Sequence, residues 1–230
     1  MTERLLDSSS AIAERIAALG SAHITRLEAY AETLRASHGE VPHFDPFDGG
    51  VDARLLFLLA TPGPSLAPIR FTSRDNPTGT ARTLRRLFAA AGIPRRESVL
   101  WNAVPWILLR RGRTLGVPSA HDRAAARAVL PDLLELLPRL EAVVLLGAEA
   151  STLADRVQER VPIVFMAPHP SPANLAADQT AFARLERAFM EVSAVSRRSA
   201  QPTGAPDIKQ RALRSGAIVT CPHEVVRVQN

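Results

Sequence analysis

Four short apolar runs alternate with stretches of helical periodicity, and this alternation constrains the fold more than any other feature. Each run is mainly apolar and has a Pro or Gly within two residues of its end, which is typical of a strand buried on both faces. The runs are residues 55–60, 98–104, 142–146 and 163–167, and the helical stretches after them are 80–91, 120–137, 148–159 and 179–195. The order predicts an α/β fold, a three-layer αβα sandwich with a central four-stranded parallel sheet.

The flanking segments differ in character from this alternating region. Apolar residues recur at helical spacing between Ser10 and Ser37, whereas Gly, Pro, Ser and basic residues dominate after Arg197. We therefore divide the 230 residues into an N-terminal helical segment packed on the domain, 1–50, an α/β domain, 51–196, and a linker and C-terminal tail, 197–230. The apolar share of 46% excludes a disordered chain.

Cysteine usage and the N-terminus limit the class of protein. Cys221 is the only cysteine, so one chain can form neither a disulfide nor a Cys-ligated zinc or iron–sulfur site. Residues 1–10 are polar and precede no apolar segment of signal or membrane type. We expect a cytoplasmic monomer without a membrane partner, a metal ion or an organic cofactor.

The charge balance is compatible with a polyanionic partner. Lys and Arg number 28 against 23 Asp and Glu, a net charge of +5, and Lys209 is the only lysine. Arginine suits bidentate contacts to phosphate. The arginine preference of a GC-rich genome would give the same excess, so both explanations stay open.

Polar or proline-bounded loops follow three of the predicted strands. They begin at Ala60-Thr61-Pro62-Gly63, at Asn102 and at His169-Pro170-Ser171-Pro172. Each has an ordinary structural explanation when taken alone, as a turn, a buried amide or a structural histidine. Because the carboxyl ends of parallel strands meet at one edge of a sheet, we expect the three loops to form one ligand site there.

The order of these motifs resembles the uracil-DNA glycosylase superfamily, over about residues 54–189. The His-Pro-Ser-Pro sequence after an apolar strand is the most specific element, and LGAEAS at 146–151 resembles a run found in bacterial members. The resemblance implies a glycosylase-like fold and a monofunctional hydrolase of base-excision repair. Such an enzyme flips uracil out of DNA, hydrolyses its N-glycosidic bond and leaves an abasic site.

The resemblance also implies roles for individual residues. Phe71 would stack on the base, Asn102 would read its edge, and His169 would donate to the departing base. The further residues implied for base binding are Ala60, Pro62, Gly63 and Asn76, and those for DNA contact are Ser171, Pro172, Ala173 and Asn174. From their positions we add Arg74, Arg110 and Arg111 as phosphate contacts, although solvated loops carry such residues too.

The first loop departs from the family pattern. Ala60 and Thr61 stand where the best-known members carry an acidic or amide residue that handles the attacking water. Asp75 is the nearest acidic candidate, and Thr61 can hold a water by a hydrogen bond. The single cysteine further indicates a cluster-free branch, whose pocket would extend to hypoxanthine or xanthine.

Three other functions would require different features of the sequence. A non-catalytic binder of damaged or abasic DNA would retain the fold and need no water-handling acid, so it stays the alternative. A nucleotide-binding protein would carry a GxGxxG or GxxxxGK[ST] loop, and an α/β-hydrolase a GxSxG elbow. The chain has none of these motifs after its predicted strands.

Overall fold

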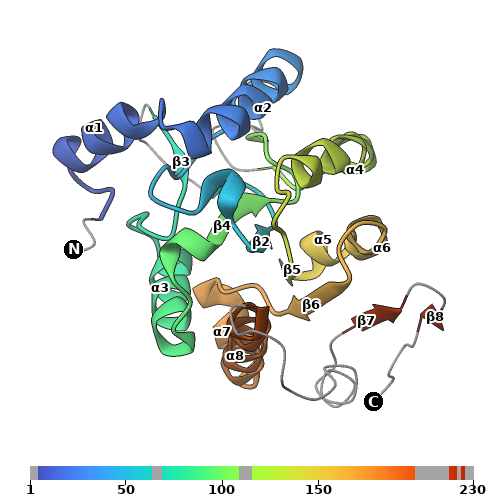
Figure 1. The fold of residues 1–230 in the computed structure, drawn as a ribbon. Coiled ribbons are helices and arrows are strands. Elements are labelled where there is room, and N and C mark those ends of the chain that lie inside the picture. Colours follow the sequence, from blue (N-terminus) through green and yellow to red (C-terminus); the bar gives the residue numbers. More distant parts are fainter. Residues whose placement is uncertain (1–4, 64–68, 109–115, 200–217, 222–223, 226–230) are drawn as a thin grey trace.

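A parallel four-stranded sheet lies between two layers of helices in this computed structural model (Figure 1). The structure describes residues 5–63, 69–108, 116–199, 218–221 and 224–225. The strands follow the order β4-β2-β5-β6, with every neighbouring pair parallel. Their bounds are β2 Leu55–Leu59, β4 Ser98–Asn102, β5 Ala142–Leu146 and β6 Ile163–Ala167. The predicted three-layer α/β fold is confirmed.

Alternate residues of each strand enter two separate cores, which explains why the runs are mainly apolar. Leu56 and Leu58 of β2 face the core that lies under α2, Ala22–His38, and α4, Ala120–Glu135. Leu55 and Phe57 face the core under α3, Gly79–Ala91, and α8, Ala181–Ser199. Both faces of the sheet are therefore covered, and polar groups gather at its edge.

Local sequence signals set the helix ends. The Thr78 side chain accepts a hydrogen bond from the backbone of Ala81 at the start of α3, and Gly92 ends this helix with a left-handed φ of 62°. Ser119 and Asp122 form a reciprocal capping box at the start of α4. The helix predicted over 148–159 is divided into α5, Ala148–Ser151, and α6, Ala154–Gln158.

The periodicity of the sequence did not predict several short elements. The helical stretch 10–37 becomes α1, Ser9–Ala18, and α2. In the region predicted as a loop, β1, His43–Phe44, pairs in parallel with β3, Phe71–Thr72. Two single turns of 3₁₀-helix, η1 and η2, and helix α7 complete the set, over Gly50–Asp52, Arg95–Glu97 and Pro172–Ala177.

The predicted tail contributes to the sheet. Strand β7, Ile218–Cys221, runs antiparallel to β6, and β8, Glu224–Val225, pairs with β7. Helix α8 extends to Ser199, past the predicted boundary at 196. In the part of the chain that the structure describes, no helix is both long and apolar enough to cross a membrane.

Candidate active site

His169 stands just beyond the carboxyl end of β6, held by contacts with two loops. Its Nδ1 accepts a hydrogen bond of 3.2 Å from the backbone N–H of Ser171. A Cβ atom on Gly147, which follows β5, would lie 2.8 Å from the Cβ of His169. Gly147 also has a φ of 95°, so glycine is needed there both for the conformation and for the close approach. The sequence analysis missed this role, although a glycine directly after a buried strand was its signal.

The environment of His169 fixes its protonation state. Partial burial lowers the pKa of the imidazole below its usual value, because burial disfavours the charged form. Since Nδ1 accepts a hydrogen bond, the neutral ring carries its hydrogen on Nε2. His169 therefore presents a neutral Nε2–H donor near pH 7.

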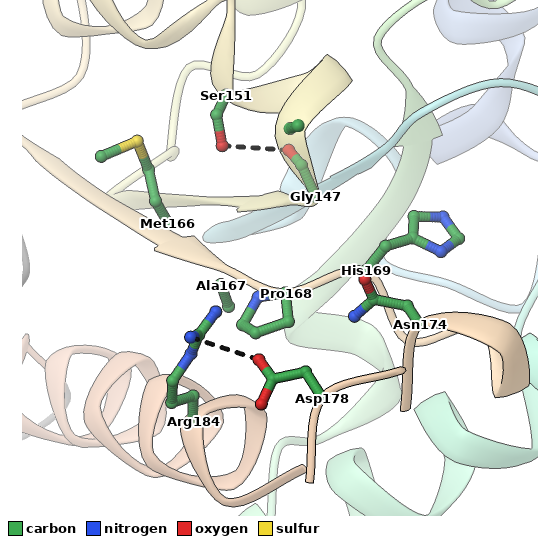
Figure 2. A pocket seen from close by; sticks show the side chains of 10 residues that line it. Gly147, Ser151, Met166, Ala167, Pro168, His169, Asn174, Asp178 and Arg184 are labelled. Atoms are coloured by element: carbon green, nitrogen blue, oxygen red, sulfur yellow. Dashed lines mark hydrogen bonds and ion pairs between the residues drawn. The ribbon is translucent and has the colours of Figure 1, made fainter. Parts of the chain in front are cut away.

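A cavity of about 400 Å³ lies beside the His169 loop (Figure 2). Its lining includes Gly147, Met166 and Asn174, and the Arg184 guanidinium reaches it while pairing with Asp178 at 3.4 Å. Figure 2 shows the His169 ring extending away from Met166 and Arg184, so the ring does not fill this space. The loop after β6 thus borders an open cavity.

Asn102 ends β4 at the same edge of the sheet. Its side chain is buried, and Nδ2 donates a hydrogen bond of 3.1 Å to Oγ1 of Thr72. The hydrogen-bonded pairing of β4 with β2 continues past Asn102, because the backbone N–H of Val104 donates to the carbonyl of Ala60. The first loop therefore starts next to Asn102, with Thr61 half-buried, Pro62 buried and Gly63 exposed. Thr72 is a second residue that the sequence analysis missed.

Phe71 does not join Asn102. The Phe71 ring packs with Leu6 and Ala11 of the N-terminal segment. Thr72, the next residue of β3, bonds to Asn102, and successive residues of a strand point to opposite faces. The predicted stacking of Phe71 on a base bound by Asn102 is therefore corrected: this ring is part of the packing under α1.

Asp75 lies in a buried ion-pair cluster, which comprises Arg15, Asp45, Asp48, Arg74, Asp75 and Arg95. Its Oδ2 lies 2.5 Å from Nη2 of Arg15 and 2.7 Å from Nη1 of Arg95. The residue is 0% exposed, so solvent does not reach the carboxylate. The prediction that Asp75 handles the attacking water is corrected, because two arginines and full burial hold it inside the protein.

Arg74 belongs to the same cluster. Its Nη2 donates to Oγ of Ser98 at 2.7 Å and pairs with Asp48 at 3.2 Å, while the guanidinium covers the Phe88 ring. A side chain that is 2% exposed does not reach a DNA phosphate. The predicted DNA contact of Arg74 is therefore corrected, and Arg110 and Arg111 lie outside the described residues.

The loops after β3 and β6 come together near His169. A Cβ atom on Gly79, the first residue of α3, would collide with the ring of Pro172 in α7. Ser171 caps α7 by accepting from the backbone of Asn174, and Pro172 and Ala173 are exposed. Asn76 is half-buried and donates to the Phe71 carbonyl at 2.9 Å. DNA contacts from 171–174 and base binding by Asn76 stay predictions.

Metal binding finds no support in the side-chain arrangement. Within the described ranges, His, Cys, Asp and Glu side chains do not gather into a group of three or more that could hold a metal ion. We group Thr72 and Asn102, which share a hydrogen bond, with Thr61 and His169, which lie just beyond the carboxyl ends of β2 and β6, and call these four residues the strand-edge site.

The fold and the strand-edge site define the class: an α/β protein with polar side chains at the carboxyl ends of its parallel strands. The family model described as the Uracil DNA glycosylase superfamily matches residues 46–192, more than half of the chain. The chain belongs to the uracil-DNA glycosylase superfamily, and this membership supports a general DNA glycosylase role. A comparison with curated proteins finds no match.

Proposed function

We propose that this protein is a monofunctional DNA glycosylase that removes uracil from DNA and leaves an abasic site. The observation that carries the proposal is the neutral imidazole of His169 at the edge of the sheet, whose Nδ1 accepts from Ser171 and whose hydrogen is therefore on Nε2 as a donor. Membership of the superfamily supports DNA as the substrate.

In the proposed reaction the bond between C1′ and the base nitrogen breaks, and its electron pair leaves with the base. The sugar becomes an oxocarbenium-like cation, and negative charge spreads onto the base oxygens. Nε2–H of His169 donates a hydrogen bond to O2 of the departing base, where that charge develops. Water then adds its oxygen to C1′, and the proton that it loses passes to the base anion, which gives a neutral base and an abasic sugar.

Asn102 reads the flipped base in this proposal. Uracil presents an acceptor at O4 beside a donor at N3, which an amide matches with one N–H and its carbonyl oxygen. Cytosine presents the reverse pattern, so the same amide orientation rejects it. Thr61, half-buried at the end of β2, holds the attacking water by a hydrogen bond.

Because Asp75 is buried, the proposed cleavage proceeds without a carboxylate that activates the water held by Thr61. A dissociative transition state depends more on stabilising the departing base than on activating the water, so the hydrogen bond from His169 supplies the main effect. Hypoxanthine and xanthine are the further bases to test, because both arise by deamination.

One observation favours a second function, a non-catalytic binder of damaged or abasic DNA. The first loop lacks an acid, and the structure removes Asp75 from consideration as its replacement. Such a binder would retain the fold, and the Nε2–H of His169 would take part in no reaction.

An alkali-cleavage gel assay decides between the two functions. Purified full-length protein is incubated without metal with single- and double-stranded oligonucleotides that carry one uracil, hypoxanthine, xanthine or normal base. We expect alkali-sensitive cleavage at uracil, retained in His121→Ala, which alters an exposed histidine of α4, and lost in His169→Ala. Tight binding to abasic DNA with no cleavage of any base would contradict the glycosylase and favour the binder.

A further inference from the structure

We propose that Thr72 is a positioning residue that sets the base preference by holding the Asn102 amide in one orientation. This inference rests on the proposed function. Nδ2 of Asn102 donates to Oγ1 of Thr72 at 3.1 Å, and the two residues are 4% and 5% exposed. Water therefore cannot readily replace the hydroxyl, and because the hydroxyl acts as the acceptor in this contact, it keeps the Nδ2 end of the amide toward Thr72.

The geometry of an amide turns this contact into a choice of base. One Nδ2 hydrogen is used by Thr72, which leaves the second Nδ2 hydrogen and Oδ1 side by side as a donor and an acceptor. That pair matches O4 and N3–H of uracil. Rotation of the amide by half a turn exchanges the two ends, and the exchanged pair matches the amino group and N3 of cytosine.

Two structural features fix the position of β3, the strand that carries Thr72. Thr72 is paired in register with Phe44 across the ladder of β1 and β3. The Phe44 ring stacks on Trp101, the residue before Asn102, with centroids 3.6 Å apart and planes 5° apart. The ladder and the aromatic pair thus tie the strand that carries Thr72 to the strand that carries Asn102.

Ser73, the residue after Thr72, is held by the buried ion-pair cluster. The hydroxyl of Ser73 donates to Asp45 and accepts from the backbone N–H of Asp75 at 2.9 Å. Asp45 and Asp75 are in turn held by Arg15 and Arg95. The cluster therefore supports the reading of the base indirectly, by fixing the end of β3.

The test compares Thr72→Val, which removes the hydroxyl at nearly constant volume, with Thr72→Ser, which keeps it. Thr83→Val is the matched control, because Thr83 is also buried and its hydroxyl donates to the Gly79 carbonyl within α3. For each full-length variant we would measure kcat/KM for uracil excision. We would also measure Kd for strands carrying 2′-fluoro-deoxyuridine or 2′-fluoro-deoxycytidine, whose glycosidic bonds resist cleavage.

We expect Thr72→Val to lower kcat/KM about tenfold and to narrow the ratio of the two Kd values by about the same factor, since one buried hydrogen bond is involved. Thr72→Ser and Thr83→Val should keep the wild-type ratio. A lower rate at an unchanged ratio in Thr72→Val would overturn the proposal, and so would an unaltered rate and ratio. Absence of uracil excision by the wild-type protein would instead refute the proposed function.

Discussion

Two groups of polar residues, the buried ion-pair cluster and the strand-edge site, differ in what holds them. The buried ion-pair cluster is enclosed: Arg15 and Asp75 are 1% and 0% exposed, and each contacts more than one charged partner. His169 of the strand-edge site is half-buried and is held by one backbone N–H and by the close approach of Gly147. The charged residues of the cluster therefore support the fold, whereas the proposed reaction uses the neutral side chains of His169 and Asn102.

The largest effect is expected when the buried ion-pair cluster loses a cation. Arg15→Ala leaves Asp45 and Asp75 without one of their partners, and a buried carboxylate without its counter-ion costs about 3–5 kcal/mol. Denaturant unfolding measures this loss of stability. Arg127→Ala is the matched control, because the exposed pair of Arg127 with Asp155 contributes less than about 1 kcal/mol. Equal losses in the two variants would remove the distinction between enclosed and exposed pairs.

The next effect concerns the support of His169. Gly147→Ala places a methyl group against the side chain of His169 and forces a non-glycine residue to a φ of 95°. We expect a loss of stability of about 1–3 kcal/mol together with a clear fall in kcat for uracil excision. Gly20→Ala, where a Cβ meets no atom within 4 Å, should alter neither quantity. Normal kcat in Gly147→Ala would show that the position of His169 does not depend on this contact.

The smallest effect is a change in the pH dependence of stability at Asp48. Burial raises the pKa of this carboxyl to about 6, against the opposing influence of Arg74 and Arg95. Because its unfolded pKa is lower, the folded protein binds the proton first, so the contribution of Asp48 to stability rises as pH falls from about 6 toward 4. Asp48→Asn should lack this contribution. Unfolding curves of both proteins across this range measure it, and parallel pH profiles would contradict the raised pKa.

The sequence predicted the fold well because the strands and long helices carry strong, continuous patterns. The runs at 142–146 and 163–167 coincide with β5 and β6, and Gly92 ends α3 as expected. The two-residue strands β1 and β3 are too short to leave a periodic pattern, so the ladder that carries Thr72 was missed. Helix α7 begins with Pro172, which also suits a loop.

The site was predicted less completely, because position along the chain does not reveal burial. Asp75 and Arg74 follow Phe71 closely and carry charges suited to water and phosphate. Their partners, however, lie far away in sequence: Arg15 is contributed by α1 and Asp48 by the loop after β1. His169 and Asn102 were predicted as site residues because Asn102 ends a buried strand and His169 lies two residues after one, at the edge of a parallel sheet, and their roles stay predictions.

The most direct test of the central claim measures turnover and DNA affinity separately in His169→Ala. In the proposed reaction Nε2–H of His169 donates to the departing base, so this hydrogen bond strengthens mainly in the transition state. Single-turnover excision of uracil should slow by about 100-fold or more, while Kd for uracil-containing DNA stays within about threefold of the wild-type value. Equal losses of affinity and rate, or an unchanged rate, would contradict the role of His169 as the donor to the departing base.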